Sequence, residues 1–170
     1  MNLPVPLKLV MVLVTAALLQ AGIVSWLNVG GYVPDLLLVV AVAAGVVGGV
    51  DRGALIGFGA GLCTDLMVTT PFGLWALVGC LTGAAAGYVS GTSLVRSPTN
   101  RAMTFAVAVG AGLLAFAVLA RLVGQASLGT IDLPLAVVTG AVAAGILSRI
   151  ASRVLTWALG PDVVPPGRVP

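Results

Sequence analysis

The sequence predicts an all-α membrane protein, a polytopic bundle of six transmembrane helices. Of its 170 residues, 59% are hydrophobic and only 8% are charged, and the mean hydropathy is +1.17. A soluble domain carries about 25% charged residues, so a chain this apolar could not cover its own surface in water. Apolar segments of about 20 residues recur, and each could cross about 30 Å of hydrocarbon. The alternating pattern of a transmembrane barrel is absent, which leaves helices as the spanning form.

The six helices are expected at residues 7–27, 34–50, 53–70, 72–95, 102–123 and 134–158, with short connections between most of them. The first apolar run follows Lys8 and is longer than the core of a signal peptide, so we expect it to be retained. Three helices start at or beside a proline, where the missing N–H does least harm: Pro34, Pro71 and Pro134. Residues 1–160 therefore form one predicted transmembrane domain, and the Pro-rich tail 161–170 is expected to be disordered.

The basic residues predict the orientation. With both termini in the cytoplasm, the inner side holds every Lys and Arg of the chain except Arg121. An excess of Lys and Arg marks cytoplasmic loops. We therefore expect a multi-pass protein of the bacterial inner membrane with both termini cytoplasmic, and with residues 69–70 and 125–132 on the outside.

Two series of glycines recur at every fourth residue. One is Gly49, Gly53, Gly57 and Gly61, and the other is Gly79, Gly83, Gly87 and Gly91. This spacing places small residues on one helix face, where two backbones can approach closely. A hairpin that turns near Pro71 predicts three level pairs: Gly61 with Gly83, Gly57 with Gly87, and Gly53 with Gly91. A chain with 23 glycines could contain such series by chance, but their matched depth favours helix packing.

The sequence lacks the residues of most enzymes. There is no histidine and no glutamate, and Lys8 is the single lysine. A histidine-based nucleophile and a metal site of histidine and carboxylate ligands are excluded. No phosphate-binding loop is present, and no cluster of basic side chains suggests nucleic-acid binding. Cys63 and Cys80 form no CxxC motif and are expected to be buried free thiols. We therefore expect no enzymatic activity, no metal and no cofactor.

Asp65 is a carboxylate inside an apolar helix. It follows Gly61 at the same four-residue spacing, so it is expected to point into the bundle. Placing a charge within the membrane costs roughly 2.5–3.5 kcal/mol on insertion scales, so a partner is expected. The sequence offers Arg121 or the backbone donors near Pro71. Asp65 is then a lock that anchors the outer end of its helix, although a ligand-binding role stays open.

Three further charged residues have simple interpretations. Asp35 follows Pro34 at the start of a helix, where a carboxylate complements the partial positive charge of the helix end. Arg149 and Arg153 lie at the cytoplasmic end of the last helix, in a polar stripe with Ser148, Ser152 and Thr156. We expect this stripe to meet lipid headgroups or an acidic partner surface.

Residues 30–92 resemble the rod shape-determining protein MreD family. The matching motifs are Pro34-Asp35, Gly61-Leu62 with Asp65-Leu66, and Gly73-Leu74 with Ala76-Leu77. The resemblance implies a non-enzymatic inner-membrane subunit of the cell-elongation machinery, which directs peptidoglycan synthesis. It also implies a bitopic membrane partner similar to MreC, and joint action with MreB, RodA and the transpeptidase of RodA.

Two other functions are alternatives. The chain also resembles the substrate-binding subunits of energy-coupling-factor vitamin transporters, which share this fold class and carry an A-x-x-x-A pattern in the first helix, here Ala17 and Ala21. Their binding sites usually need polar and aromatic side chains on the outer loops, and those loops are poor in both here. A flippase or scramblase of anionic lipids would need a basic track in the interior, which the sequence does not indicate.

Overall fold

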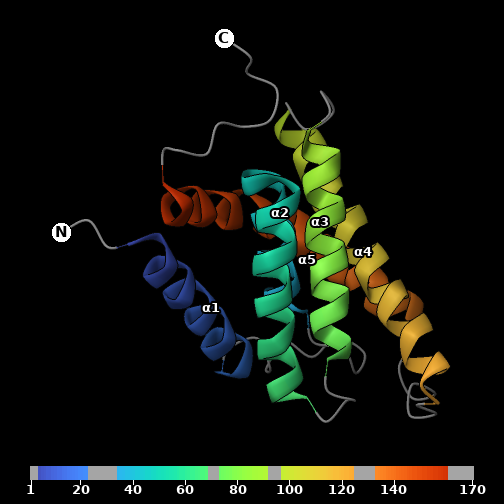
Figure 1. Cartoon of the computed structure of the whole chain (residues 1–170). Coiled ribbons are helices and arrows are strands. Elements are labelled where there is room, and N and C mark those ends of the chain that lie inside the picture. The colour runs from blue at the N-terminus through green and yellow to red at the C-terminus, as the bar shows by residue number, and fades with distance from the viewer. Residues whose placement is uncertain (1–3, 23–33, 69–72, 92–96, 125–132, 161–170) are drawn as a thin grey trace.

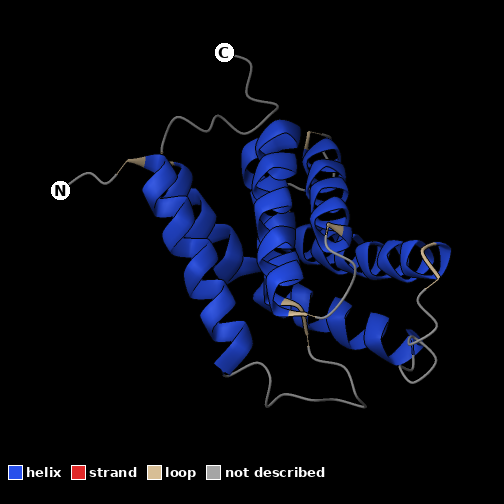
Figure 2. Ribbon diagram, turned by 60° about the horizontal axis from the view of Figure 1, so that its bottom comes forward, coloured by secondary structure: helices blue, strands red, loops and turns tan. Residues whose placement is uncertain are grey.

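The computed structural model describes residues 4–22, 34–68, 73–91, 97–124 and 133–160. These residues form five helices and no strand: α1 Val5–Gly22, α2 Leu36–Met67, α3 Leu74–Ser90, α4 Pro98–Leu122 and α5 Leu133–Leu159 (Figure 2). All except α3 are long and apolar enough to cross a membrane. The prediction of an all-helical fold with several membrane spans is confirmed. The described residues form five elements and not the expected six, because the helices expected at 34–50 and 53–70 are joined in one element, α2, without a loop between them.

Gly49 is the point at which α2 departs from helical geometry. Its φ of 82° and ψ of −173° are the non-helical values inside the element. Glycine tolerates a positive φ because it has no β-carbon. The expected connection Asp51-Arg52 is therefore not a loop, since both residues are helical.

The two arms of α2, residues 36–48 and 50–67, lie side by side. A β-carbon built on Gly53 would lie 2.7 Å from the Cα of Gly45, and one on Gly57 would lie 3.4 Å from the Cβ of Ala41. In a straight helix, eight residues rise about 12 Å. The chain therefore doubles back at Gly49, and α2 is a helical hairpin that turns at one residue (Figure 1).

The first arm of α2 is the centre of the bundle. Every residue from Leu37 to Gly45 is buried. A helix that is apolar all round is expected to be enclosed by other elements. The second arm and α3 stand beside it, α5 crosses behind, and α1 lies at the edge (Figure 1). The core is thus built around the apolar side chains of one short helical arm, and side chains of the other helices, such as Phe105 and Leu155, pack around it.

The helix ends differ from the predicted ones in one place that matters for the site below. Helix α4 begins at Pro98 and is preceded by Ser97, whereas the sequence predicted a start at 102. A proline suits the first turn of a helix. Arg101 is therefore part of α4. The expected outer loops 69–70 and 125–132, the helix extensions 23–27 and 92–95, and the tail 161–170 lie outside the described residues.

Helices α2 and α3 pack through their glycines without any room to spare. A β-carbon on Gly57 would overlap the carbonyl oxygen of Gly79, and one on Gly53 would overlap that of Gly83. Gly87 lies against the backbone of Gly49. Each predicted pair is displaced by the same eight residues on α3, which is about two helical turns. Consequently Gly61 lies against the backbone of Trp75, and Gly91 is the exposed C-terminal cap of α3.

Candidate functional site

Asp65 binds the first amides of α3. The residue lies in the last turns of α2 and is 5% exposed. Its Oδ2 accepts hydrogen bonds from the N–H of Gly73 (3.1 Å) and Ala76 (3.0 Å), and its Oδ1 accepts one from the N–H of Trp75 (3.1 Å). The amides at a helix N-terminus have no partner within the helix and carry partial positive charge. Gly73, the N-cap residue, has no side chain to satisfy them, so Asp65 caps α3 from the neighbouring helix.

The hydrogen bonds decide between the two expected partners of Asp65. Backbone donors just after Pro71 are confirmed, and the pairing with Arg121 is wrong. Arg121 lies exposed in the last turn of α4. A basic residue there complements the partial negative charge of that helix end.

The cap also explains the register of the glycines. Because Asp65 holds the amides of Gly73 and Ala76, α3 starts beside residues 61–65 of α2. The sequence predicted that this helix starts at residue 72, beside residue 70 at the end of the preceding helix. The cap by Asp65 thus fixes the position of α3 relative to α2. In this register, Gly57 packs against Gly79.

Asp35 and Gln20 organise the start of α2. Asp35 is the N-cap, and its Oδ1 accepts a hydrogen bond from the N–H of Leu38 (3.0 Å). Gln20 of α1 accepts from the N–H of Leu36 (2.8 Å) and donates to the carbonyl of Pro34 (3.2 Å). Sequence reasoning missed Gln20, although an amide in an otherwise apolar helix is a signal for a hydrogen bond between helices.

The carboxyl group of Asp35 is buried just before the apolar span of α2 begins. Burial raises its pKa from 3.8 to about 6, and the hydrogen bond from Leu38 opposes part of this shift. A raised pKa in the folded state means that folding favours the protonated form. The contribution of Asp35 to stability is therefore highest below pH 3.8 and falls as the pH rises toward 6.

Asp35→Asn should remove this pH dependence. Asparagine keeps the capping oxygen and carries no charge. Relative to the wild type, we expect a gain of stability that is absent well below pH 3.8 and reaches about 2–3 kcal/mol above pH 6, since one pKa unit corresponds to about 1.4 kcal/mol. Detergent unfolding curves of both proteins across this pH range measure the difference. A difference that stays constant with pH would contradict the assignment to Asp35.

Aromatic packing closes the region between the two aspartates. The rings of Trp75 and Phe116 stack with centroids 4.1 Å apart. Asp35, Thr64 and Trp75 line a void that is too small for a water molecule. The indole N–H of Trp75 is buried without a hydrogen-bond partner among the described residues. This end of the bundle is packed protein, and the roles of Asp35 and Asp65 in it are those of helix caps.

The polar stripe of α5 separates into two kinds of side chain. The hydroxyl groups donate to carbonyls of their own helix: Ser148 to Gly145, Ser152 to Ser148, and Thr156 to Ser152. Arg149 and Arg153 are exposed, and both line a cavity that also includes Arg101 of α4. The sequence does not predict the third arginine, because Arg101 precedes the helix start expected at residue 102.

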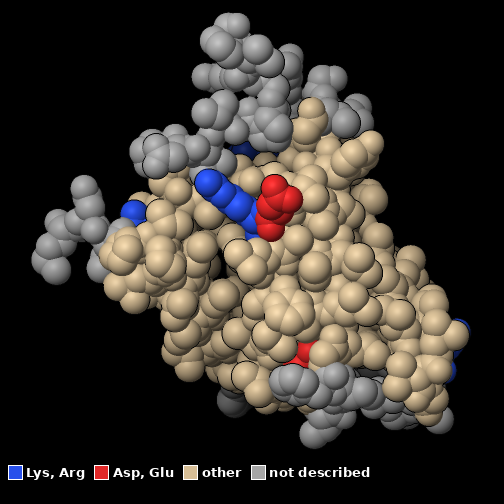
Figure 3. Space-filling model, in the orientation of Figure 1, with Lys and Arg blue, Asp and Glu red and all other residues tan. Residues whose placement is uncertain are grey.

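The remaining candidates for chemistry stay apart. Within the described ranges, no three Cys or Asp side chains come together as metal ligands. Cys63 and Cys80 are half-buried free thiols. On the face shown in Figure 3, charged side chains lie toward the ends of the bundle and leave an uncharged band between them.

These features define the class: in the part of the chain that the structure describes, four helices are long and apolar enough to cross a membrane, as in a helical membrane protein. Comparison with protein-family models, curated proteins and solved structures gives no match to the chain.

Proposed function

We propose that this protein is a non-enzymatic subunit of the cell-elongation machinery in a bacterial inner membrane, similar to the MreD family. Its partner is a bitopic protein similar to MreC, bound through the membrane helices. MreB, RodA and the transpeptidase of RodA are the wider partners that the resemblance implies.

One observation carries this proposal. The motifs that resemble the family lie on separate helical segments, yet they meet at one end of the bundle. Asp65, from the first glycine-leucine motif, binds the amides of Gly73 and Ala76, from the second. Asp35 lines the same small void as Gly61. A shared motif whose parts interact is better explained by a common structural plan than by composition alone.

The exposed helix faces suit a partner within the membrane. Only Ala16 is buried in α1, and α5 exposes large apolar residues along its length, among them Val142, Ile146 and Ile150. In the lipid environment, helix association rests on close packing of such faces. We place both termini in the cytoplasm, because that orientation puts every basic residue except Arg121 on the inner side.

The vitamin-transporter alternative receives less support. In it, Ala17 and Ala21 of α1 would dock a coupling protein. Ala17 packs against the core of the bundle, and the void between Asp35 and Trp75 is too small for a water molecule.

Affinity purification from gently solubilised membranes tests the proposal. We expect an MreC-like protein to copurify with the tagged wild type. Ile146→Ala shortens an exposed apolar side chain of α5 and should reduce the amount of partner recovered. Leu81→Ala makes a comparable change on the exposed side of α3 and is the matched control. A coupling ATPase or a bound vitamin in place of the MreC-like protein would overturn the proposal.

A further inference from the structure

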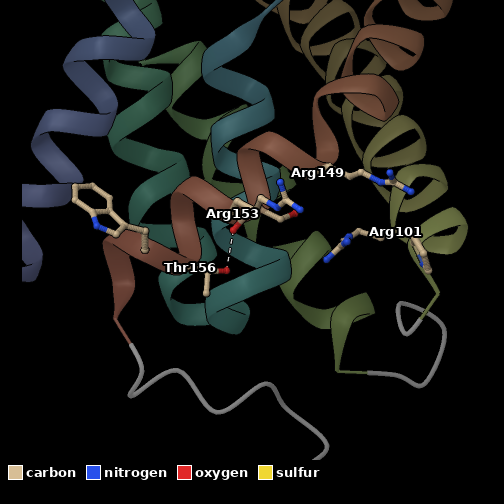
Figure 4. Close-up of a pocket in the computed structure, with 7 residues that line it drawn as sticks. Arg101, Arg149, Arg153 and Thr156 are labelled. Atoms are coloured by element: carbon tan, nitrogen blue, oxygen red, sulfur yellow. Dashed lines mark hydrogen bonds between the residues drawn. The ribbon is translucent and has the colours of Figure 1, made fainter.

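A basic cavity of about 620 Å³ opens between α4 and α5. Pro98 and Arg101 line it from α4, and Arg149, Ser152, Arg153 and Thr156 line it from α5. In Figure 4 the labelled arginines come from both helices, and they extend into the space between them. Among the described residues that line the cavity, none is acidic. Three positive charges therefore share one cavity without a counter-ion from its described walls.

Arginine in such a cavity indicates an anion with several oxygens. The guanidinium group is always charged, and its planar fork of donors matches phosphate in a two-pronged geometry. The Nε–H of Arg101 is buried without a hydrogen-bond partner among the described residues, so one donor of the cluster is unsatisfied. Because the hydroxyl protons of Ser152 and Thr156 are committed to their own helix, the arginines supply the donors for the anion.

An apolar groove of about 450 Å³ lies next to this cavity. It runs between α1 and α5, and its lining includes Met11, Leu19, Ile150 and Val154. Trp157 lines both the groove and the basic cavity. The Nζ of Lys8 stands 5.3 Å from the centre of the Trp157 ring, which adds a fourth positive charge at the junction. An apolar groove that continues into a cationic cavity matches an amphiphile with an anionic head.

We propose that Arg101, Arg149 and Arg153 bind the phosphate headgroup of an anionic membrane lipid, and that an acyl chain of this lipid lies in the groove between α1 and α5. Basic pockets between membrane helices are known sites for anionic headgroups. The proposal goes beyond the function proposed above and does not depend on it, since a partner subunit is not needed for the lipid to bind.

Lipid titration followed by native mass spectrometry tests the proposal on the full chain. The probes are phosphatidic acid and phosphatidylcholine with the same acyl chains, and inorganic phosphate as a competitor. We expect the wild type to prefer phosphatidic acid. Arg153→Gln and Arg101→Gln should each weaken its binding about tenfold or more, the loss expected for one charged hydrogen-bonding partner. Arg153→Lys should lose less than Arg153→Gln, because the charge remains and the fork is lost.

Arg52→Gln is the matched control, because it removes an exposed positive charge outside the cavity. It should leave the affinity for phosphatidic acid unchanged. Ala151→Phe, which fills the groove, should weaken lipid binding while the arginines remain. Equal affinity for the two lipids, or an equal loss in Arg52→Gln, would overturn the site. Displacement of the lipid by inorganic phosphate at a similar concentration would indicate that the cavity binds free phosphate. That result would overturn the proposal of a lipid site.

Discussion

Gly57→Ala should destabilise the protein by about 3 kcal/mol, near the upper end of the usual cost of overpacking. The added methyl group would overlap the carbonyl oxygen of Gly79, and backbone cannot move aside as the end of a flexible side chain can. One helix must shift away from the other, which also disturbs the contacts of Gly53 and Gly61. The free energy of unfolding in detergent, from titration with a denaturing surfactant, measures the loss.

Gly59→Ala is the matched control, two residues away on the same helix. A β-carbon there meets only the Cδ1 of Leu13 at 3.5 Å, which is an ordinary contact. Replacing a helical glycine by alanine reduces the entropy lost on folding, so this variant should be neutral or gain up to about 1 kcal/mol. Equal stability of the two variants would show that the glycine spacing has no packing role.

Asp65→Ala should cost about 2–3 kcal/mol, because two buried amides and one partly buried amide lose their acceptor, and each unsatisfied buried group costs about 1 kcal/mol or more. The amides belong to Gly73, Trp75 and Ala76, so the damage should appear as fraying at the start of α3. Asp65→Asn keeps one carbonyl oxygen and should lose about half as much. Detergent unfolding measures the cost, and amide hydrogen exchange locates it.

Arg121→Ala and Asp51→Ala are the controls for Asp65. Both replace exposed charged residues, so each should change stability by less than about 0.5 kcal/mol. The exchange of charges in Asp65→Arg with Arg121→Asp should recover nothing, since Arg121 does not bind the carboxylate. If the double variant regained stability, the result would support an ion pair between Asp65 and Arg121 and contradict the backbone cap.

Sequence reasoning identified the membrane class, most helix positions and the importance of Asp65, because these follow from hydropathy and from the cost of a buried charge. It could not choose between Arg121 and the backbone as the partner of Asp65. That choice depends on where α3 begins, and helix ends are the least certain part of a prediction from sequence. The same uncertainty about the start of α3 explains why the observed glycine pairs differ from the predicted ones.

The basic cavity could not be predicted from the sequence for a related reason. Arg149 and Arg153 were recognised as a stripe from their spacing on one helix. Arg101 is distant in sequence, and the helix start expected at residue 102 leaves both Arg101 and Pro98 outside the helix, whereas Pro98 is in the first turn of α4. Gln20 was missed because its partners, Pro34 and Leu36, lie at the start of another helix. Contacts between helices depend on how the helices cross, which no local pattern specifies.

The turn at Gly49 has a consequence for how the chain enters the bilayer. Residues 36–48, at about 1.5 Å per residue, reach about 20 Å, which is less than the hydrocarbon thickness of about 30 Å. This arm alone is too short for a stable insertion, and from Leu37 to Gly45 it touches protein on all sides. The arm and residues 50–67 should therefore be inserted together as one hairpin during biosynthesis. With a single glycine at the apex, lengthening the turn would separate the two backbones that touch at Gly45 and Gly53.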